Sequence, residues 1–447
     1  MVRAPLGEAG LRHAGTVVRR RRFGRDFRLY FSSQVFSQVG SSFTQFALPL
    51  LVFKLTGSPT DLALTTVATF VPYLLFGLVL GAVVDRVDRR RLMFSVDLAR
   101  AALLAVLPVL SLTGDLEVGH IYAVAFLQST LGILFDCGEF AAVPSLVPAD
   151  DLVTANGWIM STNAAGQVLG PVLAGAAVAV VPVAHLLFVD SATFLLSALA
   201  LVSIRTSFDA ADAPAAGDEP ASRVRGVLAD VREGLRFVLH DPVLRSISLM
   251  MALINLVGAS QGTQLVLFAK EELAATDAQV GLLYAAGSAG VVVIGLVAGP
   301  IRRRLSFVVT ALGSLVVSGL AFSAFGLARS LQVAVVLWAV ASGFGLLLNI
   351  NTGALRQAIV PPHLFGRVIS IASVLAWSAI PIGAVGGAAI IEATGDVRSL
   401  YVGTGLVTAA IAIAFARSPV RHGDRYLAEA LAAREGRAPA AEELRPV

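Results

Sequence analysis

Blocks of about 20 consecutive apolar residues recur along the whole chain, and they constrain its fold more than any other feature. A helix of this length spans about 30 Å, the thickness of the hydrocarbon core of a bilayer. Because a membrane-spanning backbone must satisfy its own hydrogen bonds, each block is expected to be helical. Only 14% of the 447 residues are charged, whereas about a quarter are charged in a typical soluble domain. The sequence therefore predicts an all-α polytopic membrane protein.

The apolar blocks predict twelve transmembrane helices in two halves of six. The predicted spans lie at about 30–53, 62–84, 92–113, 120–143, 157–181 and 184–204, and at about 246–269, 279–300, 305–327, 331–354, 368–392 and 399–417. The predicted domains are a basic N-terminus (1–27), an N-terminal half (28–205), a linker (206–243), a C-terminal half (244–417) and a tail (418–447). Apolar residues at helical spacing between Val224 and Val238 predict an amphipathic helix of the linker on the membrane surface.

Basic residues are distributed unevenly between the two sides of this predicted bundle. Of the 34 lysines and arginines, only Lys54, Lys270, Arg329 and Arg398 fall on odd-numbered connections, and Arg100 lies within a span. The other 29 fall on the termini and the even-numbered connections, which the positive-inside rule assigns to the cytoplasm. We therefore expect a multi-pass protein of the bacterial cytoplasmic membrane with both termini inside. Its net charge of +4 reflects this topology, and we expect no nucleic-acid partner.

The two halves share short motifs at a constant offset, which indicates an internal repeat. Matching pairs are Thr60-Asp61 and Thr276-Asp277, Arg89–Arg91 and Arg302–Arg304, Val147-Pro148 and Val360-Pro361, and Pro171 and Pro381. Many secondary transporters build a central binding site at the interface of two such repeats.

Motifs for enzyme chemistry are missing from the sequence. Lys54 and Lys270 lack the preceding glycine of a phosphate-binding GxxxxGK[ST] loop, and Cys137 is the single cysteine. The histidines have no metal-ligand spacing. We expect no enzyme activity, no metal and no cofactor. Without an ATP-binding loop, transport is expected to be driven by an ion gradient, and a proton gradient is the first candidate.

The stretch "GAVVDRVDRRRLM" at 81–93 places six charges between two predicted spans. Its Gly81, Asp85, Arg86, Arg89 and Arg90 resemble the loop motif of the major facilitator superfamily, with Asp88 where that pattern prefers Gly. The resemblance covers about residues 28–417. Residues 233–245 resemble a segment of the bacterial efflux branch that includes enterobactin and macrolide exporters, and residues 166–175 resemble the antiporter signature of drug exporters. The resemblance implies the major facilitator fold and a gating role for the loop.

Polar side chains recur on one face of several predicted spans. In the resembled family, spans 1, 4, 7 and 10 line the central cavity, which makes their amides candidates for a substrate path. These candidates are Gln34, Gln38, Gln45, Gln128, Asn255, Gln261, Gln264 and Asn349. The alternative is that they form hydrogen bonds between packed helices.

Three carboxylates within spans, Asp136, Glu139 and Asp190, are candidates for proton coupling or for a gate. Asp136 or Glu139 is alternatively expected to pair with an arginine of residues 81–93. Asp97 and Arg100, one helical turn apart, are expected to neutralise each other.

Small residues and prolines within two spans predict close helix packing and bending. The predicted interface residues are Gly166, Gly170, Pro171, Gly175, Pro381 and Gly386.

The loop at 81–93 also predicts a latch at the cytoplasmic end. Asp85 is expected to bind the N-terminus of span 11, which carries a partial positive charge, while Arg89 holds Asp136 or Glu139. The second copy, Arg302–Arg304, has no matching acid in its own loop, so the latch is expected on one side only.

Together these features predict a monomeric exporter that moves a small amphiphilic molecule out of the cell by proton antiport. An importer or uniporter of the same fold, or a membrane sensor that binds without transporting, remains an alternative.

Overall fold

The computed structural model describes residues 23–84, 87–208 and 232–434. In these ranges the regular secondary structure is entirely helical, which confirms the predicted all-α class. The N-terminal half contains α1 (Arg25–Thr56), α2 (Pro59–Val84), α3 (Arg89–Thr113), α4 (Val118–Leu146), α5 (Leu152–Ala177) and α6 (Leu186–Ser203). The C-terminal half contains α8 (Pro242–Thr263), α9 (Leu265–Glu271), α10 (Asp277–Arg304), α11 (Phe307–Gly326), α12 (Leu331–Ile359), α13 (Pro362–Thr394) and α14 (Val397–Phe415). A further helix, α15 (Gly423–Arg434), and the short 3₁₀ turns η1 (Ala149–Asp151), η2 (Val183–His185) and η3 (Pro419–His422) complete the described chain.

Eleven helical segments in the described residues are long and apolar enough to cross a membrane. In that set, α8 and α9 form one segment, Pro242–Glu271. Helix α5, which corresponds to the predicted fifth span, is as long as its neighbours but falls outside the set. Its first half carries polar residues, among them Asn156, Ser161 and Asn163, which lower its hydropathy. The chain is therefore a polytopic membrane protein with one notably polar long helix.

Local sequence signals explain where several helices begin and end. Gly57 (φ 61°) and Gly114 (φ 84°) follow α1 and α3 in the left-handed conformation that terminates a helix. Thr276 starts α10 by accepting a hydrogen bond from the backbone N–H of Gln279, whose side chain accepts in return from the Thr276 N–H. Asp241 caps α8 by accepting hydrogen bonds from the backbone N–H groups of Val243 and Leu244, and Pro242 occupies the first helical position.

The linker helix is described only from residue 232 to residue 240; the part of the prediction at 223–231 lies outside the described residues. Val238 is buried in a cluster with Leu244, Val360 and Leu364. At this residue the apolar face therefore packs on the C-terminal half of the protein, where a surface helix would have placed it against lipid.

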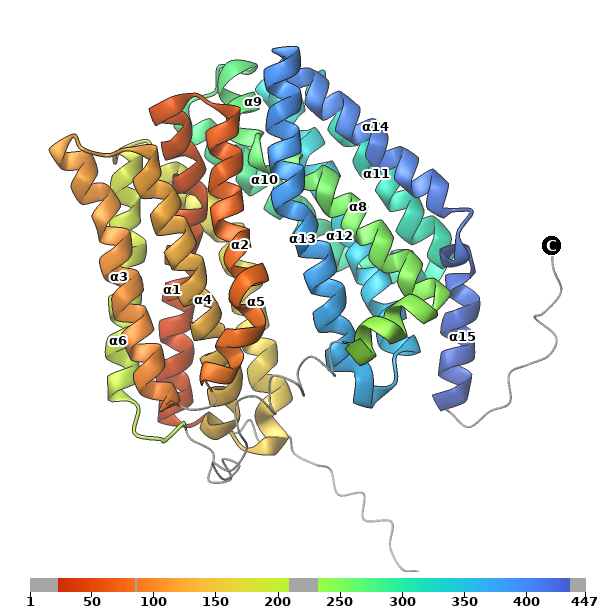
Figure 1. Cartoon of the computed structure of the whole chain (residues 1–447), viewed down its shortest axis with the longest axis horizontal. Helices are drawn as coiled ribbons and strands as arrows, with labels where there is room; N and C mark the ends of the chain where they lie inside the picture. Colours follow the sequence, from red (N-terminus) through yellow and green to blue (C-terminus); the bar gives the residue numbers. More distant parts are fainter. Residues whose placement is uncertain (1–22, 85–86, 209–231, 435–447) are drawn as a thin grey trace, which may run out of the picture.

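The two halves lie side by side and are joined at one end (Figure 1). We call this the closed end; α1 ends there, α2 begins there, and α9 lies there at the top of the view. One apolar cluster at this end contains residues of both halves, including Leu50, Phe46, Phe268 and Leu283. At the opposite, open end each half has its own apolar cluster. The cluster of the N-terminal half contains Phe27 and Met93, and that of the C-terminal half contains Ile247 and Phe307. In Figure 1 the halves diverge towards the open end.

Candidate functional site

A cavity of about 800 Å³ lies between the two halves, towards the closed end. Its wall includes residues of α1, α2, α3, α4, α5 and α6 from one half and of α8, α10 and α13 from the other. Two aromatic contacts join the halves at the cavity: Phe46 with Tyr284 (ring centroids 5.9 Å apart) and Tyr73 with Trp377 (5.6 Å apart). The cavity is large enough to hold a drug-sized molecule.

The cavity wall includes three of the predicted substrate-path residues: Gln45, Gln128 and Asn255. The structure does not place the other five in this wall. Gln34 donates to Ser197, Gln261 donates to Thr404, and Asn349 donates to the carbonyl of Gly345. Gln38 fills the space beside Gly166, and the buried Gln264 donates to the carbonyl of Pro59 at 2.9 Å. Gln34, Gln261 and Gln264 thus make the hydrogen bonds to other helices or connections that were the alternative, whereas Asn349 bonds within α12 and Gln38 makes a steric contact.

The three predicted carboxylates have different surroundings. Asp190, which is 1% exposed, accepts hydrogen bonds from Thr44 (2.5 Å), Thr193 (3.3 Å) and Ser41 (3.4 Å). Glu139 accepts a hydrogen bond from the Tyr30 hydroxyl at 2.7 Å. Asp136 lines the cavity and is exposed there.

The predicted pairing of Arg89 with Asp136 or Glu139 is not seen in this conformation. Arg89 donates to the carbonyl of Phe208 (3.2 Å) and Arg90 donates to the carbonyl of Ile204 (2.6 Å). Glu139 is bound by Tyr30 because α1 lies beside α4 at this depth. Asp85 and Arg86 of the motif lie outside the described residues, as does the predicted contact of Asp85 with span 11; Gly81 lies within α2.

Arg100 was predicted only as the neighbour of Asp97, yet it lines the cavity. Its guanidinium lies 3.9 Å from the centre of the Phe194 ring, a cation–π contact. It is close enough to act electrostatically on Asp97, Asp136 and Asp190. An arginine within a span is itself a signal of function, so the sequence held the information that would have identified it.

The predicted interface glycines largely lie at close helix contacts. Gly166 and Gly170 face Gln38 and Ser42 of α1, and a Cβ added at Gly175 would lie 2.8 Å from the Cα of Gly281 in α10. Gly386 differs, since nothing lies within 4 Å of an added Cβ. In α13 the contacts with α8 are made instead by Gly383 and Gly387, which are four residues apart and share one helix face.

Polar contacts between the halves hold the closed end together. Lys54 of α1 and Lys270 of α9 both donate to the Asp277 carboxylate, and Thr60 donates to Glu392. Thr66 and Thr263 share a hydrogen bond of 3.0 Å. The two matching loops of the internal repeat therefore meet here, with Asp277 as the acceptor for both lysines.

We expect Lys54→Gln to weaken the closed end modestly. A half-exposed ion pair stabilises by about 0.2–1 kcal/mol, so the closed end should open up to about fivefold more often. Maleimide labelling of a cysteine at the buried Ala63, in a Cys137→Ser background, measures this opening. Lys54→Arg, which keeps the positive charge beside Asp277, is the matched control and should keep labelling slow. Labelling of Lys54→Gln as slow as that of the wild type would show that the Lys54–Asp277 contact does not hold the closed end together.

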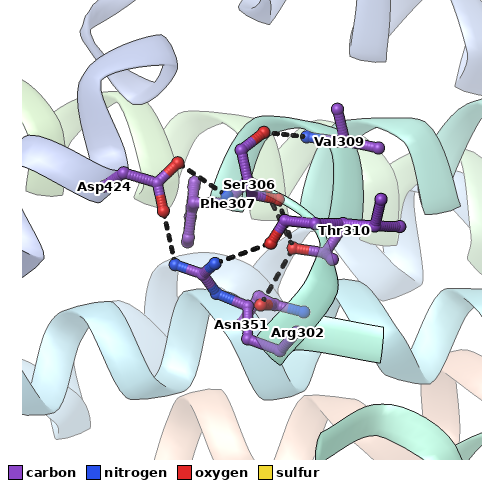
Figure 2. Close-up of polar contacts among 8 residues, drawn as sticks. Arg302, Ser306, Phe307, Val309, Thr310, Asn351 and Asp424 are labelled. Carbon is purple, nitrogen blue, oxygen red and sulfur yellow. Dashed lines mark hydrogen bonds and ion pairs between the residues drawn. The ribbon is translucent and has the colours of Figure 1, made fainter. Parts of the chain in front are cut away.

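The second copy of the arginine motif has an acidic partner after all, supplied by the tail. Figure 2 shows the Asp424 carboxylate of α15 between the Arg302 guanidinium (2.5 Å) and the backbone N–H of Phe307 (2.7 Å) at the start of α11. The N-terminal half is built alike, because Arg89 and Arg90 bind the carbonyls that follow α6. In each half, arginines next to the connection between the second and third helices thus bind the chain that follows the last span. Asp424 lies 122 residues from Arg302 and on the same half, so the expectation of a one-sided latch between the halves stays a prediction.

We expect Asp424→Asn to lower the stability of the C-terminal half. Loss of a partly exposed ion pair and of a helix-capping acceptor costs about 1–2 kcal/mol. The midpoint of thermal unfolding in detergent should fall by about 2–4 °C. Glu429→Gln is the control, since it removes the Arg425–Glu429 pair on the surface of α15 and should change little. Equal midpoints for Asp424→Asn and the wild type would show that the contact does not stabilise the fold.

The fold and the site define a polytopic transporter, with two repeated halves, a cavity between them and ionisable groups inside the membrane. Residues 24–442 match the transmembrane secretion effector family, and the chain belongs to this family of the major facilitator superfamily. It is a transporter and not an enzyme.

Comparisons with individual proteins agree with the family. The chain is 28% identical over 368 residues to the multidrug efflux pump Tap of Mycolicibacterium fortuitum (80% of this chain, 87% of the relative). It is 24% identical over 365 residues to macrolide efflux protein A of Streptococcus pyogenes, with the same coverage. The fold resembles that of a bacterial homologue of the human lysosomal transporter Spinster in an inward-facing, occupied conformation (TM-score 0.67, 14% identity, 90% and 97% covered). It also resembles an inward-facing bacterial homologue of the iron transporter ferroportin (TM-score 0.65, 18% identity, 88% and 99% covered).

Proposed function

We propose that this protein exports a small amphiphilic molecule across the bacterial cytoplasmic membrane by alternating access, in exchange for protons. The observation that carries the proposal is the cavity between the halves, with polar contacts across its closed end and carboxylates in its wall. The efflux pumps among its relatives support the direction of transport.

The charge distribution supports an inward-facing assignment for the structure. The arginine-rich loops after α2 and α10 lie at the open end, and the positive-inside rule places that end in the cytoplasm. The cavity then faces the compartment from which an exporter takes its substrate. The start of α1 and the end of α14 lie at this same end.

The buried carboxylates support proton exchange. Ionisable groups inside a membrane protein are costly and mark proton or substrate paths. Asp190 lies in the cavity wall among three hydroxyls, and Glu139 and Asp136 lie on α4. A proton bound at one of them during the return step would couple the gradient to export.

Single neutral variants test the coupling. We expect one of Asp136→Asn, Glu139→Gln and Asp190→Asn to abolish proton-driven uptake of ethidium into everted vesicles, in which export runs inward, while the purified variant still binds an uncharged dansyl amide. Asp115→Asn, in the exposed connection between α3 and α4, is the control and should transport normally. Full proton-driven efflux by all three variants would rule out coupling through these carboxylates.

A further inference from the structure

The charged side chains of the cavity wall come from one half only. They are Arg100, Asp136 and Asp190, all of the N-terminal half. The facing wall from the C-terminal half is formed by small and apolar residues such as Ile254, Gly258 and Ile380, with Asn255 and Thr263 as polar exceptions. A molecule that fits both walls has one charged or strongly polar end and one apolar end.

Negative charge is in excess on the charged wall. Among the described residues that line the cavity, Arg100 is the one cation, and it faces two lining carboxylates. Asp97, which is 1% exposed and lies one turn from Arg100, and Glu139 add two more acids close behind. An anion entering this cavity would meet uncompensated carboxylates, which is unfavourable where water is scarce.

Asp136 is the carboxylate left available to a ligand. Hydroxyl groups donate to Asp190 and Glu139, whereas within the described part of the chain no hydroxyl or ammonium group donates to Asp136. Its side chain is exposed in the cavity, on the wall opposite the apolar residues of the C-terminal half.

Aromatic rings line the same cavity as this carboxylate. Phe70 and Tyr73 of α2 line the cavity with their centroids 6.4 Å apart, and Trp377 of α13 meets Tyr73 edge to face. Asp136 is near enough to act electrostatically on Tyr73. A carboxylate beside aromatic faces is the combination that binds an alkylammonium group, through a charge-assisted hydrogen bond and cation–π contacts.

We propose that the substrate is an amphiphile with a protonated amine, which Asp136 binds while the apolar body of the molecule lies against the C-terminal half. This inference rests on the proposed function, because it names the substrate class of the same cavity. The proposal predicts that the cavity binds cationic amphiphiles in preference to acidic ones, such as carboxylate or catecholate ligands.

Three matched probes test the proposal by binding alone. They are dansyl amides whose two-carbon arms end in a dimethylamino, a hydroxyl or a carboxylate group. With wild-type protein in nanodiscs, we expect the dimethylamino probe to bind roughly tenfold or more tightly than the hydroxyl probe, and the carboxylate probe least tightly. In Asp136→Asn the tenfold preference should shrink to about twofold or less, with the affinity for the hydroxyl probe unchanged.

Two variants complete the design. Asp115→Asn removes an exposed acid far from the cavity wall and should keep the full preference. Unchanged binding of the hydroxyl probe shows that Asp136→Asn is folded, and Asp136→Glu should retain most of the preference. Equal wild-type affinity for the dimethylamino and hydroxyl probes, or an undiminished preference in Asp136→Asn, would overturn the proposal. Because no gradient is applied, a retained preference without export would count against the proposed function alone.

Discussion

Replacing Arg100 with Gln should nearly abolish transport and strongly destabilise the N-terminal half. Arg100 is the cation shared by Asp97, Asp136 and Asp190, and its removal leaves buried carboxylates without a counter-charge. Among the described residues Arg100 forms no direct ion pair with these acids, and the Asp97 carboxylate has no hydrogen-bond partner, so the stability effect comes from removing a nearby cation and should be about 1–3 kcal/mol. We expect a reduction of ethidium efflux of more than tenfold and a clearly lower midpoint of thermal unfolding in nanodiscs.

The double variant Arg100→Gln with Asp97→Asn separates stability from function. It also removes the acid of Asp97, which is buried without a hydrogen-bond partner one turn from Arg100, so it should recover much of the lost stability without recovering transport. Arg100→Lys keeps the charge and should be intermediate. A wild-type melting curve for Arg100→Gln would show that the arginine does not compensate the acids around it.

Replacing Gly281 with Val should prevent the closed end from closing. Gly281 lies against Gly175 of the other half, so close that a Cβ at Gly175 would lie 2.8 Å from its Cα. The branched side chain must push α10 away from α5, which favours the alternate state, in which this end is open. We expect efflux to fall more than tenfold, and labelling of a cysteine at Ala63 by an impermeant maleimide to rise by a similar factor.

Gly299→Val provides the matched control on the same helix. Nothing lies within 4 Å of a Cβ added at Gly299, so this substitution should leave closed-end labelling unchanged. Slow labelling of Gly281→Val would mean that the helices close without the glycine contact.

The helices were predictable because hydropathy and length alone decide which segments cross a bilayer. The polar first half of α5 shows the limit of that signal: Asn156 and Asn163 lower its hydropathy, yet the helix has the length of its neighbours. The internal repeat was also readable, and Thr276-Asp277 indeed starts α10 as Thr60-Asp61 lies at the start of α2.

The roles of individual polar residues were less predictable because they depend on helix rotation. Gln38 and Gln45 lie on one predicted stripe, but Gln38 packs on Gly166 while Gln45 lines the cavity. The partner of Arg302 could not be predicted from the sequence pattern, because Asp424 lies on a helix that follows the last span. Asp136 was identified as a candidate, but its neighbours Tyr73 and Arg100 follow from the packing of α2 and α3 against α4.

Transport by the purified protein in proteoliposomes tests the central claim most directly. Vesicles with an imposed proton gradient are supplied with ethidium or erythromycin, and accumulation is followed with and without a protonophore. Gradient-driven exchange predicts accumulation against the concentration gradient that the protonophore abolishes. Equilibration regardless of the proton gradient would indicate a uniporter, and binding without any accumulation would indicate a sensor; either result would contradict proton-coupled export.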